Sequence, residues 1–267
     1  MRYAIVMDKC SMKPVHAAIM LRQSPDWRQL DYGYLESLSQ FERQAGLPSG
    51  FIRRLVLLWD QAFRVPYFQV RQHLKDLTMR NLASVEDAVL FSIHESRCIA
   101  LPSARFYLFT DDDDWFSPDI VAHLVVHDAP GLEGMIWQSV RLAQTIDVRQ
   151  TRHCFTNNYC VTSDFVGAPA SVSRLQSVLQ HFDANKVFFD NGFNGVFLEW
   201  PLSIANKHPC SPARLFNEYG KDLTVDILRK DAERFVSGIS SGRIPEEVAW
   251  ARWCVGELSE IFLETLS

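Results

Sequence analysis

Residues 104–119 read ARFYLFTDDDDWFSPD, and the interpretation of the whole chain starts from this stretch. Residues 104–109 are apolar and aromatic and have the length of a buried strand. The four aspartates at 111–114 follow, and then a helix start is predicted with Ser117 as N-cap and Pro118 at the first helical position. A strand that ends in carboxylates and leads into a helix is where open α/β sheets place their ligand sites.

The four neighbouring aspartates repel one another, so the cluster needs either water around it or a cation among its oxygens. On an extended turn, alternate side chains point to the same side. We therefore expect Asp111 and Asp113 to face one way and the two even-numbered aspartates the other. A divalent cation on one side would bridge the carboxylates to a diphosphate. The alternative is a solvated loop in which Asp114 or Ser117 only caps the next helix.

The composition limits the class of protein. The chain has 267 residues, 47% of them hydrophobic, which suffices for one large core. Its net charge of −5 argues against a broad basic surface for nucleic acid. No apolar run approaches the roughly 20 residues that a membrane-spanning helix needs, so we expect no transmembrane segment and leave peripheral membrane association open. The apolar start, which ends at Asp8, is too short and too quickly polar for a signal peptide. Six scattered cysteines without a C-x-x-C pair predict reduced thiols and a cytoplasmic location.

Hydrophobic periodicity predicts an α/β fold with a helical C-terminal part. We expect one domain made of an N-terminal half at 1–125, a mixed half at 126–212 and a helical extension at 213–267. The predicted helices are 32–44, 49–62, 65–82 and 171–182, with mostly helix from 212 onward; the predicted strands are 1–8, 85–93, 104–109, 134–142, 155–161 and 196–204.

Residues 106–119 resemble the DxD region of GT-A-type nucleotide-sugar glycosyltransferases, in which an apolar strand delivers an aspartate run followed by an aromatic pair, Ser-Pro-Asp and a helix. The likeness is greatest to a bacterial, rhamnosyltransferase-like group. It implies a GT-A-like, Rossmann-type mixed sheet flanked by helices. It also implies a transferase that moves a sugar from a nucleotide-diphosphate donor to an acceptor hydroxyl in bacterial glycan or polysaccharide synthesis.

The resemblance also implies roles for the aspartates. Asp111 and Asp112 would contact the donor, with the first of them addressing its ribose. Asp111, Asp113 and Asp114 would hold Mn²⁺ or Mg²⁺ against the diphosphate, with Asp113 as the main ligand.

A second polar segment, residues 204–212, supports this interpretation. Enzymes of the resembled family often carry a late histidine that completes the metal shell, and His208 is the candidate here. Lys207 would place a positive charge near phosphate, and Ser211 a hydroxyl at a helix start. The alternative is an ordinary turn between a strand and a helix.

The segment Val6–Cys10 departs from the family, because it lacks the Pro-rich loop that seats the base and ribose of the donor. Asp8 is the only candidate there for a donor contact. An inverting enzyme also needs a carboxylate base. Asp190 is the leading candidate, since its Gly/Asn-rich, aromatic surroundings suit an acceptor loop, although a plain turn explains the same residues. Competing candidates for this base are Asp183, Asp164 and Glu199.

Other patterns carry less information. His123 and His127 are four residues apart and would share a helix face, but they lack the glutamate of a metalloprotease motif. No P-loop or Rossmann fingerprint occurs. The sequence thus favours a metal-dependent glycosyltransferase that takes a nucleotide-sugar donor and a glycan or small-molecule acceptor. The alternatives are a metal-dependent phosphohydrolase or nuclease, and a non-catalytic binding module.

Overall fold

The computed structural model describes residues 15–22, 27, 38, 42–43, 45–93, 101–149, 153–155, 157–167, 171–190 and 192–267. Its strands are β1 (Val15–Arg22), β2 (Ala88–Ile93), β3 (Ala104–Thr110), β4 (Trp115–Phe116), β5 (Gly134–Leu142), β6 (Ile146–Arg149), β7 (Tyr159–Thr162) and β8 (Gly195–Asn206). Its helices are α2 (Phe51–Ala62), α3 (Tyr67–Ala83), α4 (Ile120–Val126), α5 (Ser163–Val166), α6 (Val172–Gln176), α7 (His181–Phe188), α8 (Pro212–Tyr219), α9 (Val225–Ser241) and α10 (Arg252–Leu266), with short 3-10 turns η2 (Gly220–Asp222) and η3 (Glu246–Ala251).

The described strands form one mixed sheet in the order β2-β1-β3-β7-β5-β8-β4, and β6 pairs with β5. β1 is parallel to both β2 and β3. The next strand in the chain, β2, lies on one side of β1, and β3 lies on the other. β7 is antiparallel to β3 and to β5, while β5 and β8 are parallel. The carboxyl ends of β1 and β3 therefore lie next to each other at the point where the direction of winding reverses.

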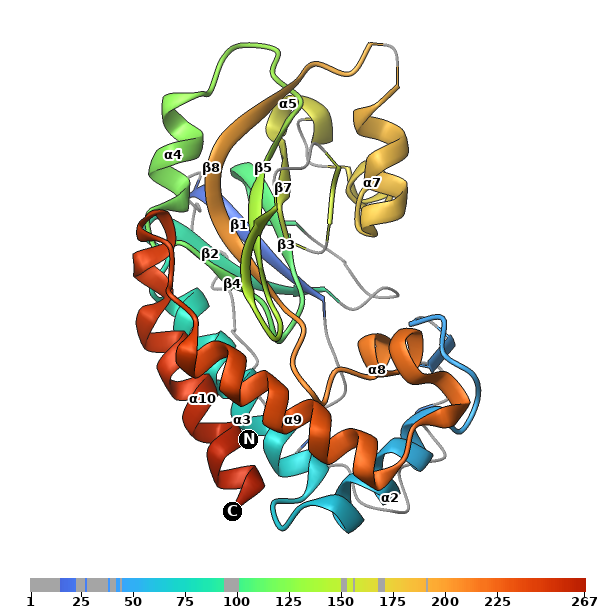
Figure 1. Ribbon diagram of the computed structural model, residues 1–267. Coiled ribbons are helices and arrows are strands. Elements are labelled where there is room, and N and C mark those ends of the chain that lie inside the picture. Colours follow the sequence, from blue (N-terminus) through green and yellow to red (C-terminus); the bar gives the residue numbers. More distant parts are fainter. Residues whose placement is uncertain are drawn as a thin grey trace, which may run out of the picture.

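Apolar side chains cover both faces of the central strands. Along β1, Ala17 and Ile19 belong to the core on one face, together with α4, whereas Ala18 and Met20 belong to the core on the other face. Accordingly, α4 and α7 lie on opposite sides of the sheet in Figure 1. A third core joins α2, α3, α8, α9 and α10 to the ends of β5 and β8, and these helices gather below the sheet in Figure 1. The fold is thus a mixed α/β sheet flanked by helices, with a helical C-terminal part.

Most of the sequence-based elements are confirmed. The helices predicted at 49–62 and 65–82 correspond to α2 and α3, and the mainly helical stretch from 212 onward corresponds to α8 to α10. The strands predicted at 85–93, 104–109, 134–142 and 196–204 correspond to β2, β3, β5 and β8. The strand predicted at 1–8 lies outside the described residues, as does most of the helix predicted at 32–44.

One strand was missed, and two expectations about element boundaries are wrong. The sequence did not indicate β1, which lies between β2 and β3 in the sheet. Ser117 is not the N-cap of α4: its amide continues the sheet pattern by donating to the Leu202 carbonyl (2.9 Å), and Asp119 is the N-cap. The strand predicted at 155–161 starts only at Tyr159, because Asn158 folds back to accept a hydrogen bond from the amide of Phe155 (2.5 Å).

The single helix predicted at 171–182 is divided into α6 and α7. The carbonyl groups between the two helices bond to side chains of the sheet. The Tyr159 hydroxyl donates to the Val178 carbonyl (2.8 Å), and Arg22 Nη1 donates to the Leu179 carbonyl (2.8 Å). Apolar periodicity alone does not reveal such a break, because Val178 and Leu179 are buried as a helix face would be.

No helix of the described part of the chain is long and apolar enough to cross a membrane.

The short strand β4 is fixed to α3 by one amide side chain. Asn81 is fully buried; its Nδ2 donates to the Phe116 carbonyl (3.0 Å), and its Oδ1 accepts from the Phe116 amide (2.8 Å). β4 pairs with β8 along one edge, and on the edge that faces α3 these two hydrogen bonds take the place of a neighbouring strand. It holds the segment just after the aspartates against the helix.

We expect Asn81→Ala to destabilise the protein by about 2–4 kcal/mol, because it leaves two buried backbone groups without a partner. Urea unfolding followed by circular dichroism measures this difference. The control is Gln72→Ala on the same helix, which removes a partly buried contact to Asp76 and should change the unfolding free energy by less than about 0.5 kcal/mol. Equal effects of the two substitutions would contradict the role given to Asn81.

Candidate functional site

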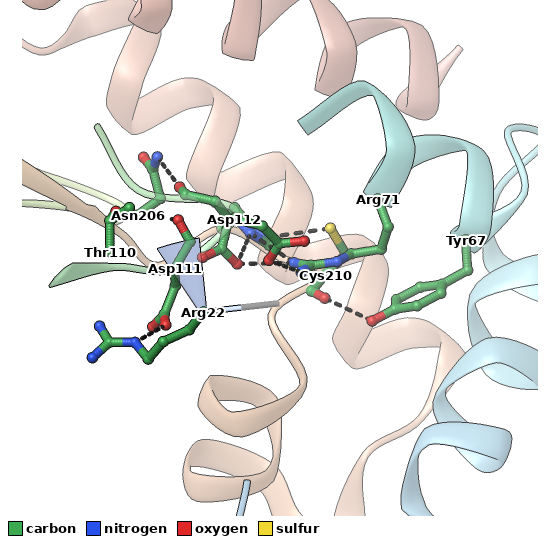
Figure 2. A network of polar contacts seen from close by, with 10 residues as sticks. Arg22, Tyr67, Arg71, Thr110, Asp111, Asp112, Asn206 and Cys210 are labelled. Atoms are coloured by element: carbon green, nitrogen blue, oxygen red, sulfur yellow. Dashed lines mark hydrogen bonds and ion pairs between the residues drawn. The ribbon is translucent and has the colours of Figure 1, made fainter. Parts of the chain in front are cut away.

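The aspartate cluster begins directly after β3, beside the carboxyl end of β1. Asp111 follows the last residue of β3, and Arg22 is the last residue of β1. Arg22 Nε donates to Asp111 Oδ1 at 2.6 Å, and this hydrogen bond links the carboxyl ends of β1 and β3 (Figure 2). In open α/β sheets, ligands bind outside the carboxyl ends of the strands where the winding reverses. The predicted site residues are therefore in the position where this class of fold carries ligands.

Two arginines neutralise much of the aspartate cluster. Arg71 from α3 reaches Asp112 at 3.4 Å and Asp113 at 2.9 Å, while Arg22 pairs with Asp111. The expected alternation along the turn is wrong, since Asp112 and Asp113 approach the same guanidinium. The repulsion among the four carboxyl groups is thus offset by arginine charges in this structure. Neither arginine was singled out from the sequence.

Asp114 is almost fully buried. Its Oδ1 accepts a hydrogen bond from the amide of Asn206 at the end of β8 (2.8 Å). Asn206 Nδ2 also donates to the Asp113 carbonyl. The end of β8 and the aspartate turn are therefore linked by both side-chain and backbone groups.

His208 lies next to Asp113, as the sequence predicted. Its Nε2 is 3.0 Å from Asp113 Oδ2 and 3.1 Å from Arg71 Nη1. Its Nδ1 is 3.2 Å from the sulfur of Cys210, and its ring stacks on Phe262 of α10. The imidazole is fully buried.

Residues of the helical part hold the main chain of His208 in place. Arg214 Nη1 donates to the His208 carbonyl at 3.3 Å. The same guanidinium forms a buried two-point ion pair with Asp231 of α9 at 2.7 and 2.5 Å. Tyr219 donates a further hydrogen bond to Asp231 (2.9 Å). The position of His208 thus depends on α8 and α9.

The surroundings shift the pKa values of three site residues in different directions. Burial raises the pKa of Asp114 to about 8, and the negative charges of its neighbours Asp113 and Asp111 add to the shift, whereas Lys207 opposes it. Burial alone would also raise the pKa of Asp113, but Arg71 and His208 outweigh it and hold this pKa well below the usual range. Burial lowers the pKa of His208 to about 4, against the opposing effect of Asp113. At neutral pH the site therefore contains a neutral Asp114, an ionised Asp113 and a neutral imidazole.

The other predicted donor-binding residues flank this cluster or lie outside the described residues. Lys207 is partly buried, and Ser211 is the N-cap of α8, as expected for a hydroxyl at a helix start. Asp8 lies outside the described residues.

The candidate bases are not brought to the cluster by any described contact. Asp190 is exposed just after the end of α7, and Glu199 is exposed on β8. Asp183 pairs with Lys186 at 2.7 Å, and Asp164 accepts from the Gly131 amide at 2.9 Å and pairs with an arginine of β3.

His123 and His127 each have a partner within or next to α4. His123 contacts Asp119 at 3.5 Å, and the Nδ1 atom of His127 lies 2.9 Å from the backbone carbonyl of His123. The plain helical interpretation of both residues therefore agrees with their contacts.

Asp113 and His208 have a spacing that fits a divalent cation. Two donors about 2.1 Å from an octahedral ion are about 3.0 Å apart when their bonds are at right angles. The observed separation between Oδ2 and Nε2 is 3.0 Å. No group of three or more His, Cys, Asp or Glu side chains among the described residues is arranged to hold a metal ion. A cation here would take its remaining ligands from water and from a bound phosphate, as Mg²⁺ commonly does.

No protein-family model and no curated protein matches this chain.

The raised pKa of Asp114 predicts a pH-dependent effect of Asp114→Asn. In the unfolded chain an aspartate ionises near pH 4, whereas the folded protein keeps Asp114 neutral up to about pH 8. The stability that the neutral group contributes is complete below pH 4 and is lost as the pH rises toward 8. The neutral Asn variant avoids this loss, so its unfolding free energy should rise relative to that of the wild type between pH 5 and pH 8.

Urea unfolding over this pH range, without added metal, measures the difference. Asp147→Asn, at an exposed position of β6, is the control and should show no such trend. Parallel curves for wild type and Asp114→Asn would mean that Asp114 is ionised throughout.

Proposed function

We propose that the protein is a metal-dependent glycosyltransferase that binds a nucleotide-diphosphate sugar at the carboxyl ends of β1 and β3. The observation that carries this proposal is the approach of Asp113 and His208. These residues are 95 positions apart and were assigned to one metal site from the sequence, and their donor atoms lie 3.0 Å apart. The location of the cluster at the reversal of the sheet winding supports the same proposal.

In this proposal Asp113 and His208 hold Mn²⁺ or Mg²⁺. Both have the protonation state that a metal ligand needs, since Asp113 is ionised and His208 is neutral at pH 7. The ion would neutralise the negative charge that grows on the diphosphate as the glycosidic bond breaks. Lys207, next to the metal ligand in sequence, would supply a further positive charge to the phosphates.

The proposed base for the acceptor hydroxyl is Asp190. A base needs a carboxylate that is not shared with a strong partner. Asp183 and Asp164 are engaged in ion pairs, whereas the Asp190 carboxylate makes no such pair among the described residues. Glu199 is also exposed and is the second choice.

A non-catalytic module that binds an anionic ligand is a second candidate function. The observation that favours it is the pairing of three of the aspartates with Arg22 and Arg71, which offsets much of their negative charge without a metal ion. Such a module would bind nucleotides equally well with and without Mn²⁺. The two functions therefore differ in the metal dependence of binding.

Titration calorimetry with nucleoside diphosphates, in the presence and absence of Mn²⁺, tests the proposal. We expect Mn²⁺-dependent binding of at least one nucleotide to the wild type. Asp113→Ala and His208→Ala should each abolish the metal dependence, because each removes one of the two proposed protein ligands. Asp147→Ala, at an exposed position, and His123→Ala, at a partly exposed position, both lie outside the cluster and should behave as the wild type.

Nucleotide binding that ignores Mn²⁺ would reject the metal-dependent enzyme and favour the binding module. If the protein releases sugar from a bound nucleotide sugar, chromatography of the products distinguishes transfer to an acceptor from plain hydrolysis.

A further inference from the structure

The atoms Arg71 Nη1, Asp113 Oδ2 and His208 Nε2 form a closed triangle. Its sides are 2.9 Å from Arg71 to Asp113, 3.1 Å from Arg71 to His208 and 3.0 Å from His208 to Asp113. The guanidinium is almost completely buried, and its carbon lies 4.9 Å from the ring centre of Trp27. Its Nε is buried and has no hydrogen-bond partner among the described residues. Arg71 is therefore the positive charge at the centre of this site (Figure 2).

The three sides of the triangle cannot all be hydrogen bonds at once. If Nε2 of His208 carries the proton, it donates to Asp113 and has no lone pair for Arg71. If Nε2 lacks the proton, it accepts from Arg71, and its lone pair then lies close to the carboxylate without a hydrogen between them. In either tautomer, one of the three contacts is therefore not a hydrogen bond.

A divalent cation would satisfy both Asp113 and His208, but it needs the single lone pair of Nε2. Arg71 competes for this lone pair. A dication and a guanidinium about 3 Å apart in a buried site would also repel each other strongly. The ion and Arg71 therefore cannot occupy their places beside His208 together.

We propose that Arg71 is a resident counter-ion that an incoming divalent cation must displace from Asp113 and His208. This inference rests on the proposed metal site. The displaced guanidinium would still have Asp112, 3.4 Å away, as one anionic partner, and a diphosphate bound to the same cation would replace Asp113 as the other. We therefore expect the metal and the diphosphate to bind cooperatively. The metal releases the guanidinium that the diphosphate then contacts, and the diphosphate gives that guanidinium a partner in place of Asp113.

The test is the affinity for Mn²⁺ alone, measured by calorimetry or by the electron paramagnetic resonance signal of free Mn²⁺. Wild-type protein should bind Mn²⁺ weakly without nucleotide and more tightly with a nucleoside diphosphate. Arg71→Met removes the competing charge and keeps much of the apolar side chain. It should bind Mn²⁺ alone about tenfold more tightly than the wild type, and the gain from nucleotide should shrink by a similar factor.

Arg80→Met is a matched control. Arg80 lies on the same helix, pairs with the carboxylate of Glu257 and lies 5.9 Å from the ring centre of Trp253, but it is exposed. Its replacement should leave the Mn²⁺ affinity unchanged.

Thermal unfolding provides a second readout. Arg71→Met leaves buried carboxylates without their cation, so the metal-free variant should melt at a lower temperature than the wild type. Mn²⁺ should raise the melting temperature of the variant more than that of the wild type. If Arg71→Met does not fold, Arg71→Lys keeps a charge on a shorter side chain and should show a smaller increase in Mn²⁺ affinity.

The outcomes separate this inference from the proposed function. Unchanged or weaker Mn²⁺ binding by a folded Arg71 variant would overturn the displacement of Arg71, even if the wild type binds metal and nucleotide together. Tight Mn²⁺ binding by Arg71→Met alone, with no nucleotide binding by either protein, would support the displacement and reject the nucleotide-dependent function. Absence of Mn²⁺ binding in both proteins would overturn both.

Discussion

The arrangement of the site depends on one buried ionic contact, the guanidinium of Arg71 against Asp112 and Asp113. A cluster of carboxylates at a strand end is unstable by itself, and burial increases the cost of each unpaired charge. Arg71 reaches the cluster because α3 packs against β4, immediately after the aspartates. The charge balance of the site therefore depends on the packing of α3, which lies before β3 in sequence.

Three buried asparagines complete this construction around β4 and the end of β8. Asn81 bonds to both backbone groups of Phe116, and Asn157 donates to the carbonyl of Ile204 (2.8 Å). Asn206 links the end of β8 to the aspartate turn through its amide and its side chain. Amide side chains can satisfy backbone donors and acceptors at once, which suits them to irregular ends of a sheet. The short β4 is stable because of these contacts rather than because of its length.

The sequence predicted the parts of the fold that depend on local pattern. The strand before the aspartates and the strand at 134–142 are recognisable because they are apolar and bounded by turn residues. The approach of His208 to Asp113 was anticipated through the family resemblance, which implies a late histidine in the metal shell of the aspartates. The contacts of Arg22 and Arg71 with the aspartates were not anticipated. An arginine beside apolar residues has the same local sequence pattern whether its side chain points to solvent or into the protein. The division between α6 and α7 was missed for a related reason, because hydrogen bonds from Tyr159 and Arg22 cause it and both residues are distant in sequence.

The buried pair of Arg214 and Asp231 has a consequence for how the protein is made. Asp231 belongs to α9 and fixes Arg214, which in turn holds the carbonyl of His208, while Phe262 of α10 stacks on the histidine ring. During synthesis, the sheet and the aspartate turn leave the ribosome well before these last helices. The nascent chain therefore exposes the carboxylates before their histidine neighbour is fixed, and the site matures only when the final helix docks.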